Sequence, residues 1–377
     1  MVPKFQSLFP IIKERLEGEL VREVSDETDE LVGVPYPYVT PAATAKNALY
    51  YWDSYFLNLG LIRLKLVDLA RHHVENLTFL SRRRGYVPVS NLRAAVQTAE
   101  LPLLPWMVRD VYRATGDKDW LSRMLPDVLA EFRFWTNETH TAPIGLYRFG
   151  DQQAQVSYEA ATCLPSRLYT SSLSQYAPVD LNALLCRNAK MIYDLQVEAD
   201  GQGDPQLLQL SQEIKNAYEL LWDEKRQFYF DRHLVDNRFV DFQTLAGFIP
   251  LFVEMADAGR AELLQRKLEQ FVAPGGVNLL DRDYGTPAGV VSRSLLCAPY
   301  LYFLVKGLID YEFMEDAADI GVNWLTMVHN VYKRTGEMWQ WYNVAAKNAL
   351  SPERLNTPNM GATAGAFITL VDELGLD

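Results

Sequence analysis

Cysteines, histidines and basic runs are too sparse in this chain to build several common kinds of site. The three cysteines, Cys163, Cys186 and Cys297, have no CxxC spacing, so neither a disulfide framework nor a zinc site is predicted. The five histidines have no paired spacing for a metal ion, and we expect no cofactor. The longest basic run is at 82–84 and the net charge is −12, so we expect no nucleic-acid partner.

The chain also lacks a long uninterrupted apolar run. Charged residues interrupt the apolar ones throughout residues 1–20. We therefore expect neither a signal peptide nor a membrane span, and the natural expectation is a cytoplasmic protein.

Apolar residues, by contrast, are abundant and mostly follow a helical period. Such stretches cover 57–70, 181–195, 207–222, 261–271, 296–308 and 316–332, with Gly, Pro or Asn between them. Alternating strand patterns are few and short, as at 227–230. About a dozen helices fit into the chain at ordinary helix and loop lengths. The pattern predicts an all-α fold in a single domain.

The most informative segment is residues 50–56, with the sequence Tyr-Tyr-Trp-Asp-Ser-Tyr-Phe. Aromatic faces beside a lone acid suit a sugar ring, because its C–H faces stack on aromatics while a carboxylate binds a pair of hydroxyls. The alternative is an aromatic helix start buried in the core, with Asp53 as a helix cap.

This segment resembles the signature of trehalases and their relatives among the inverting α-glucosidases of glycoside hydrolase families 37 and 63. Further similar segments follow in the same order, at 35–41, 85–91, 178–185, 221–231 and 335–344. The resemblance implies an (α/α)6 toroid, a ring of six helical hairpins whose central funnel holds the sugar. It places the toroid at 35–377 and leaves 1–34 as an N-terminal helical extension.

The resemblance also implies a ligand and a set of residues that bind it. The ligand is a small carbohydrate or polyol, of the trehalose type or the glucosyl- or mannosylglycerate type. The binding residues implied by the matching motifs are Trp52, Asp53, Asn91, Arg167, Trp339, Gln340 and Tyr342. In the last motif Gln340 replaces the family's carboxylate, which departs from the pattern.

The catalytic positions depart further. An inverting glycosidase needs a carboxylate base and a carboxylic acid on opposite sides of the scissile bond. The resemblance implies Glu353 as the base, eight residues before Gly361, while the position of the acid falls on Cys163. A thiol with an ordinary pKa is a poor proton donor to an ether oxygen.

Three interpretations remain open at this point. The chain is a glycoside hydrolase whose acid is a nearby carboxyl, Glu159 or Asp151. It is an enzyme of another reaction type that uses Cys163 as an acid, base or nucleophile. Or it is a sugar-binding homologue that has lost catalysis. A toroid hosts several chemistries, so the fold alone does not choose among them.

Overall fold

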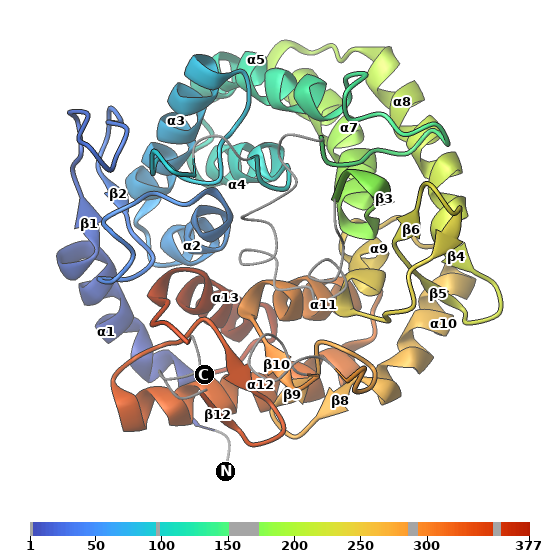
Figure 1. The fold of residues 1–377 in the computed structure, drawn as a ribbon. Coiled ribbons are helices and arrows are strands. Elements are labelled where there is room, and N and C mark those ends of the chain that lie inside the picture. Colours follow the sequence, from blue (N-terminus) through green and yellow to red (C-terminus); the bar gives the residue numbers. More distant parts are fainter. Residues whose placement is uncertain (1–2, 96–98, 151–172, 286–292, 350–355) are drawn as a thin grey trace.

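The helices form two concentric rings in this computed structural model, which describes residues 3–95, 99–150, 173–285, 293–349 and 356–377. The inner ring consists of α2 (Tyr51–Arg63), α4 (Leu104–Thr115), α7 (Val179–Asp200), α9 (Ile249–Phe252), α11 (Ala298–Asp310) and α13 (Met360–Glu373). The outer ring consists of α1 (Phe9–Glu14), α3 (Val67–Arg84), α5 (Lys118–Trp135), α8 (Pro205–Tyr218), α10 (Ala258–Lys267) and α12 (Met314–Thr335). Figure 1 shows both rings.

The inner helices contact one another in cyclic order. Each of α2, α4, α7, α9, α11 and α13 packs against the next, and α13 packs against α2. A ring closed in this way is an (α/α)6 toroid in a single domain, and it confirms the fold class predicted from the sequence.

Short antiparallel strands connect helices at the edges of the ring. Their bounds are β1 (Val21–Arg22), β2 (Tyr38–Val39), β3 (Tyr176–Ala177), β4 (Trp222–Asp223), β5 (Phe228–Tyr229), β6 (Arg232–His233), β7 (Arg238–Phe239), β8 (Val272–Ala273), β9 (Gly276–Val277), β10 (Leu295–Leu296), β11 (Tyr342–Asn343) and β12 (Asn348–Ala349). The pairs are β1–β2, β4–β5 and β8–β9, with the three-stranded orders β3–β6–β7 and β10–β11–β12.

One helical stretch predicted from the sequence is in fact a hairpin. The apolar period over 57–70 runs through the end of α2, a turn, and the start of α3. The turn forms because Lys65 takes a left-handed conformation with φ 63°, while the Leu66 N–H donates to the Leu61 carbonyl at 2.8 Å. The leucines on both sides of the turn pack against the same core. The apolar pattern therefore continues through the turn, and periodicity alone does not reveal it.

The beginning and the end of the described chain lie side by side. The short 3-10 helix Phe5–Leu8 contacts α12 and α13, and the Phe5 N–H donates to the Asp377 carbonyl at 2.8 Å. Residues assigned to an N-terminal extension therefore pack on the ring, next to its last helix (Figure 1).

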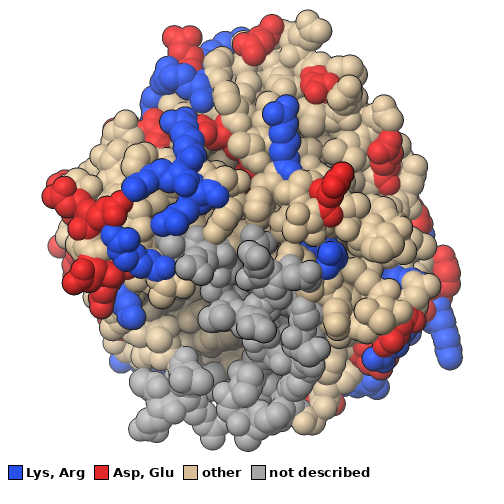
Figure 2. Space-filling view, turned by 45° about the horizontal axis from the view of Figure 1, so that its top comes forward, with Lys and Arg blue, Asp and Glu red and all other residues tan. Residues whose placement is uncertain are grey.

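The surface carries charges of both signs. On the face drawn in Figure 2, basic side chains lie beside acidic ones and most of the described surface is uncharged. None of the helices in the described ranges is long and apolar enough to cross a membrane.

Candidate functional site

The first turns of three inner helices surround a small cavity. Trp52 and Asp53 come from the start of α2, Cys297 and Pro299 from the start of α11, and Asn359, Ala362 and Thr363 from the start of α13. Gln340 from the loop before β11 completes the lining. The volume is only about 30 Å³, which is room for one or two water molecules.

A larger cavity of about 250 Å³ shares three of these side chains. Asp53, Gln340 and Asn359 line both spaces, and the larger one extends to Tyr50 and to the loop at 41–45. The Asp53 side chain therefore borders both the small and the large cavity. The carboxylate and the two amides offer hydrogen-bond acceptors and donors to a polar ligand.

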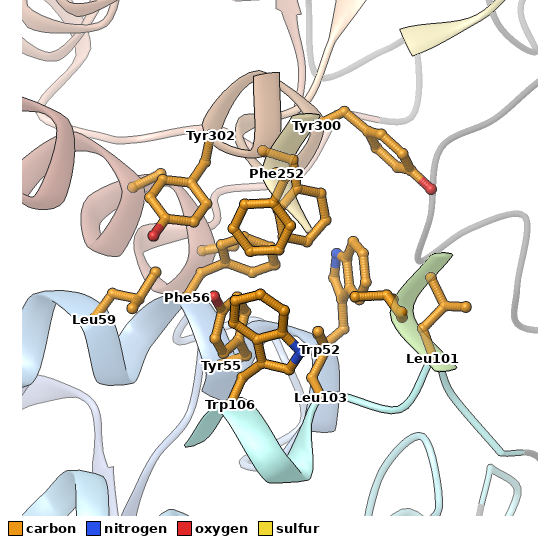
Figure 3. Packing of buried hydrophobic residues seen from close by; sticks show 14 of the residues in the cluster. Trp52, Tyr55, Phe56, Leu59, Leu101, Leu103, Trp106, Phe252, Tyr300 and Tyr302 are labelled. Atoms are coloured by element: carbon orange, nitrogen blue, oxygen red, sulfur yellow. The ribbon is translucent and has the colours of Figure 1, made fainter. Parts of the chain in front are cut away.

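Trp52 is the aromatic wall of the smaller cavity. Its side chain is 5% exposed and packs edge-on against Phe56 and Phe303, at centroid distances of 5.3 and 6.0 Å. Figure 3 shows it beside this aromatic cluster. The indole Nε1 is buried and has no acceptor among the described residues. A buried donor without a partner is costly, and a ligand oxygen would satisfy it.

Asp53 is held by the last inner helix. The Asn359 side-chain amide donates to Asp53 Oδ1 at 2.8 Å, and the Asn359 Oδ1 accepts from the Ala362 N–H at 3.0 Å. Burial raises the pKa of Asp53, against the opposing effect of the hydrogen bond from Asn359. Asn359, the N-cap of α13, thus positions the acid as well as beginning its own helix.

Gln340 and Trp339 lie at the rim of this site. Gln340 Oε1 accepts from the Thr357 hydroxyl at 3.1 Å. The Trp339 carbonyl accepts from the Thr363 hydroxyl at 2.8 Å, and its ring is part-exposed. The structure thus brings Trp52, Asp53 and Gln340 to one cavity, with the Trp339 backbone beside it, and their role in sugar binding stays a prediction.

Asn91 and Tyr342 hold the protein's own backbone. The Asn91 amide accepts from the Leu49 N–H and donates to the Val32 carbonyl, each at 2.9 Å. The Tyr342 hydroxyl accepts from the Trp339 N–H at 3.1 Å. Both side chains are 0% exposed. The structure does not bring these two side chains into the cavities that Asp53 lines.

The remaining predicted site residues lie outside the described residues. They are the expected base Glu353, the acid candidates Cys163, Glu159 and Asp151, and the expected sugar-binding residue Arg167. Their roles stay predictions. Among the residues that the structure does describe, no cluster of His, Cys, Asp or Glu could hold a metal ion.

The structure adds one acid that the sequence did not single out. Glu100 is 1% exposed; its Oε1 accepts from the Leu101 N–H at 3.1 Å, and its Oε2 is buried without a partner in the described part of the chain. Burial, followed by the negative charges of Asp53 and Asp180, raises the pKa of Glu100 to about 8. A single glutamate before an apolar segment carries no motif, so only its environment reveals it.

A second buried glutamate, Glu131, uses both of its oxygens in hydrogen bonds within the protein. Glu131 in α5 accepts from the Tyr51 hydroxyl at 2.6 Å and from the Leu104 N–H at 3.3 Å. Burial raises the pKa of Glu131 to about 8 as well. Both of its oxygens serve helix packing, which distinguishes Glu131 from Glu100.

Comparison with known proteins agrees with this geometry. Residues 46–285 match the model of the mannosylglycerate hydrolase MGH1-like glycoside hydrolase domain. A periplasmic trehalase from Escherichia coli is 24% identical over 90% of this chain and 67% of its own length. A probable trehalase from Oryza sativa is 23% identical over 92% of this chain and 74% of its own.

Solved structures share the fold. The neutral trehalase Nth1 from Saccharomyces cerevisiae superposes with a TM-score of 0.75 at 18% identity, covering 90% of this chain and 74% of that one. A family 63 mannosylglycerate hydrolase from Thermus thermophilus, solved in complex with glucose, gives 0.72 at 18% identity, covering 97% of this chain and all (100%) of that one. The matched model spans well over half of the sequence, and the chain therefore belongs to the MGH1-like glycoside hydrolase family of trehalase-related toroids.

Proposed function

We propose that this protein is an inverting glycoside hydrolase that acts on a small α-glycoside, of the trehalose type or the glucosyl- or mannosylglycerate type. The observation that carries the proposal is a pair of cavities at the starts of α2 and α13 that share Asp53 and the side-chain amides of Gln340 and Asn359. Family membership and the titles of relatives, which include trehalases and a mannosylglycerate hydrolase with glucose, support the substrate class.

In this proposal the described residues hold the sugar. The Asp53 carboxylate accepts from a hydroxyl pair of the sugar in the larger cavity, while Trp52 lines the small cavity next to it, where its buried indole N–H has no described acceptor. Gln340 and Asn359 supply further donors and acceptors at the edge of the same space. Trp339 and Arg167 complete the binding site as the family resemblance implies.

The chemical step is assigned to residues outside the described ranges. Glu353 is the proposed base that activates a water, and the proton for the leaving oxygen comes from Glu159, Asp151 or Cys163. An inverting pair of carboxyl groups stands about 6.5–9.5 Å apart, because a water must fit between the base and the sugar. A cysteine at the acid position would lower the rate, since general acid catalysis contributes about 10²–10⁴-fold.

The test is proton NMR of the protein with trehalose, glucosylglycerate and mannosylglycerate. Inversion releases the β-anomer first from the two glycerate glycosides, and equal amounts of α- and β-glucose from trehalose, because the leaving glucose of trehalose keeps its α configuration. We expect one of these signals before mutarotation with at least one substrate. Glu353→Gln should abolish turnover while leaving thermal unfolding unchanged. Initial release of the α-anomer alone, or unchanged turnover in Glu353→Gln, would contradict the assigned mechanism.

Cysteine variants separate the remaining alternatives. If Cys163 occupies the acid position and no other carboxyl replaces it, Cys163→Asp should raise a slow hydrolysis. If the thiol itself does chemistry, Cys163→Ala should stop turnover of whichever substrate the native protein accepts. Fast native hydrolysis that survives Cys163→Ala would assign the acid to Glu159 or Asp151. Sugar binding without turnover in every variant would identify a binding protein.

A further inference from the structure

We propose that a separate cavity, between α4 and α7, binds the phosphate group of a phosphorylated sugar or polyol. This cavity has a volume of about 400 Å³ and shares none of its lining residues with the two cavities that Asp53 lines. It has no part in the proposed hydrolase function, and the proposal does not depend on that function.

The position of the cavity is set by two neighbouring helices of the inner ring (Figure 1). The Trp106 indole Nε1 of α4 donates to the Asn188 Oδ1 of α7 at 2.9 Å. Arg109, one turn after Trp106, and Arg187, next to Asn188, therefore lie at a similar level of the two helices and line the same cavity. Arg113, one turn further along α4, is exposed and adds a third guanidinium to the lining.

Two of the guanidinium groups are held in place by an acid and still have donors to offer. Arg187 Nη2 donates to Glu254 at 2.9 Å, while its Nε is buried without an acceptor among the described residues. Arg109 Nε donates to Asp110 Oδ1 at 2.8 Å, and its guanidinium carbon lies 4.6 Å from the centroid of the Trp106 ring. A buried donor without a partner is costly, and a ligand oxygen would satisfy Arg187 Nε.

The number of arginines selects the kind of anion. Each guanidinium presents five N–H donors in a planar fork that matches the oxygens of a phosphate or a carboxylate. A phosphate ester carries about −1.5 to −2 charges at pH 7 and three acceptor oxygens, whereas a carboxylate carries one charge and two oxygens. Three arginines around one cavity therefore match a phosphate better than a carboxylate.

The rest of the lining indicates an organic part with hydroxyl groups. Asp194 and Glu198 lie one turn apart on α7, about 10 Å or more along the helix axis from Arg187, and offer acceptors to hydroxyls. Met191 and Leu195 supply apolar contacts between them. Sites for small molecules begin at about 300 Å³, so a cavity of this size has room for a whole sugar phosphate.

The experiment is calorimetry at about pH 7.5 with glucose 6-phosphate, inorganic phosphate and glucose as probes. We expect glucose 6-phosphate to bind at least about tenfold more tightly than inorganic phosphate, because its organic part also contacts the lining. A saturating concentration of glucose should leave the affinity for glucose 6-phosphate within about twofold, since glucose lacks the phosphate that the arginines bind.

Arginine variants locate the binding. Arg113→Gln and Arg187→Gln should each lower the affinity for glucose 6-phosphate about tenfold or more, because each removes charged donors to the phosphate. Arg113 is exposed, so its variant tests the cavity even if Arg187→Gln fails to fold. Arg266→Gln is the matched control: it removes the same charge from α10, where the Arg266 side chain is 74% exposed and lies outside the cavity. Its affinity should stay within about twofold of the native value.

The outcomes separate this site from the site at Asp53. No binding of glucose 6-phosphate, or an equal loss in Arg266→Gln and the two cavity variants, would overturn the proposal. Competition by glucose would place the sugar phosphate at Asp53 instead and would overturn it as well. Inorganic phosphate bound as tightly as glucose 6-phosphate would overturn the role of the organic part. Each of these results leaves the proposed hydrolase function standing.

Discussion

At the scale of single residues, Asp53 combines two roles that usually fall to different side chains. It is fixed by a hydrogen bond from Asn359, and it also lines both cavities of the site. The sequence allowed two interpretations of Asp53, a helix cap or a sugar-binding acid. Its N-cap position is excluded because Tyr50 caps α2 and Asp53 lies inside the first turn.

Asp53→Asn should weaken ligand binding while leaving the fold intact. Asparagine keeps the shape and one acceptor but loses the charge, and a hydrogen bond to a charged group contributes about 1.5–3 kcal/mol. We therefore expect affinity for glucose to fall about 10- to 100-fold, measured by calorimetry at pH 7. Asp127→Asn is the control, because Asp127 is a buried acid that binds Arg82 and lines neither cavity. Equal losses in the two variants would contradict a ligand role for Asp53.

At the scale of elements, one tyrosine hydroxyl joins three helices. The Tyr51 hydroxyl from α2 donates to Glu131 of α5 at 2.6 Å and accepts from the Leu103 N–H, at the start of α4, at 2.7 Å. All three groups are buried. This junction fixes the start of α2, and with it the neighbouring Trp52 and Asp53.

Tyr51→Phe should therefore destabilise the protein strongly. It leaves the Leu103 N–H and a Glu131 oxygen buried without partners, at about 1–3 kcal/mol each, so we expect a loss of about 2–6 kcal/mol in the free energy of unfolding. Tyr218→Phe is the control, since that buried hydroxyl makes one bond, at 3.2 Å, to the Val179 carbonyl. Urea unfolding of both variants measures the free energy of unfolding. A loss in Tyr51→Phe no larger than the loss in Tyr218→Phe would contradict the stabilising role of the junction.

The same junction makes stability depend on pH. The folded protein raises the pKa of Glu131 from 4.5 to about 8, so between these values the unfolded chain releases a proton that the folded chain keeps. This contribution to stability is complete below about pH 4.5 and is lost as pH rises to about 8. We expect the melting temperature to fall over this range, and to fall less in Glu131→Gln. An identical slope in the two proteins would contradict the assignment.

Elements defined by local apolar periodicity could be predicted from the sequence, whereas features set by contacts between distant segments could not. The helices at 181–195 and 316–332 follow from apolar periodicity and are confirmed within α7 and α12. The stretch at 207–222 is α-helical only as far as Tyr218, the end of α8, and continues through a 3-10 turn into β4. The turn at Lys65 was missed because leucines on both sides face one core. The burial of Glu100 and the backbone bonds of Asn91 could not be predicted, since both are set by segments distant in sequence.

At the scale of the whole molecule, closure of the ring depends on two glycines. A Cβ at Gly365 in α13 would lie 1.9 Å from the Phe56 carbonyl oxygen of α2, and one at Gly60 would lie 2.9 Å from the Gly365 Cα. The last inner helix thus reaches the first at backbone distance. This contact also brings Asn359 to Asp53, so the closed ring assembles the site.

Gly365→Ala should open or strain this contact. Overpacking of this kind costs about 1–3 kcal/mol or more, and we expect a lower melting temperature together with weaker sugar binding. Gly259→Ala in α10 is the control, because its Cβ would meet only the Asp257 side chain at 3.4 Å, and alanine favours the helix by about 1 kcal/mol. A Gly365→Ala protein as stable as this control would contradict the close packing of α13 on α2 as a requirement for ring closure.

The central claim is that the larger cavity, at the starts of α2 and α13, takes a sugar, and a crystal structure with glucose tests it most directly. The account predicts a glucose ring in the cavity lined by Asp53, Gln340 and Asn359, with a hydroxyl within hydrogen-bond distance of the Asp53 carboxylate. Glucose bound with measurable affinity in solution but located elsewhere on the molecule would contradict it.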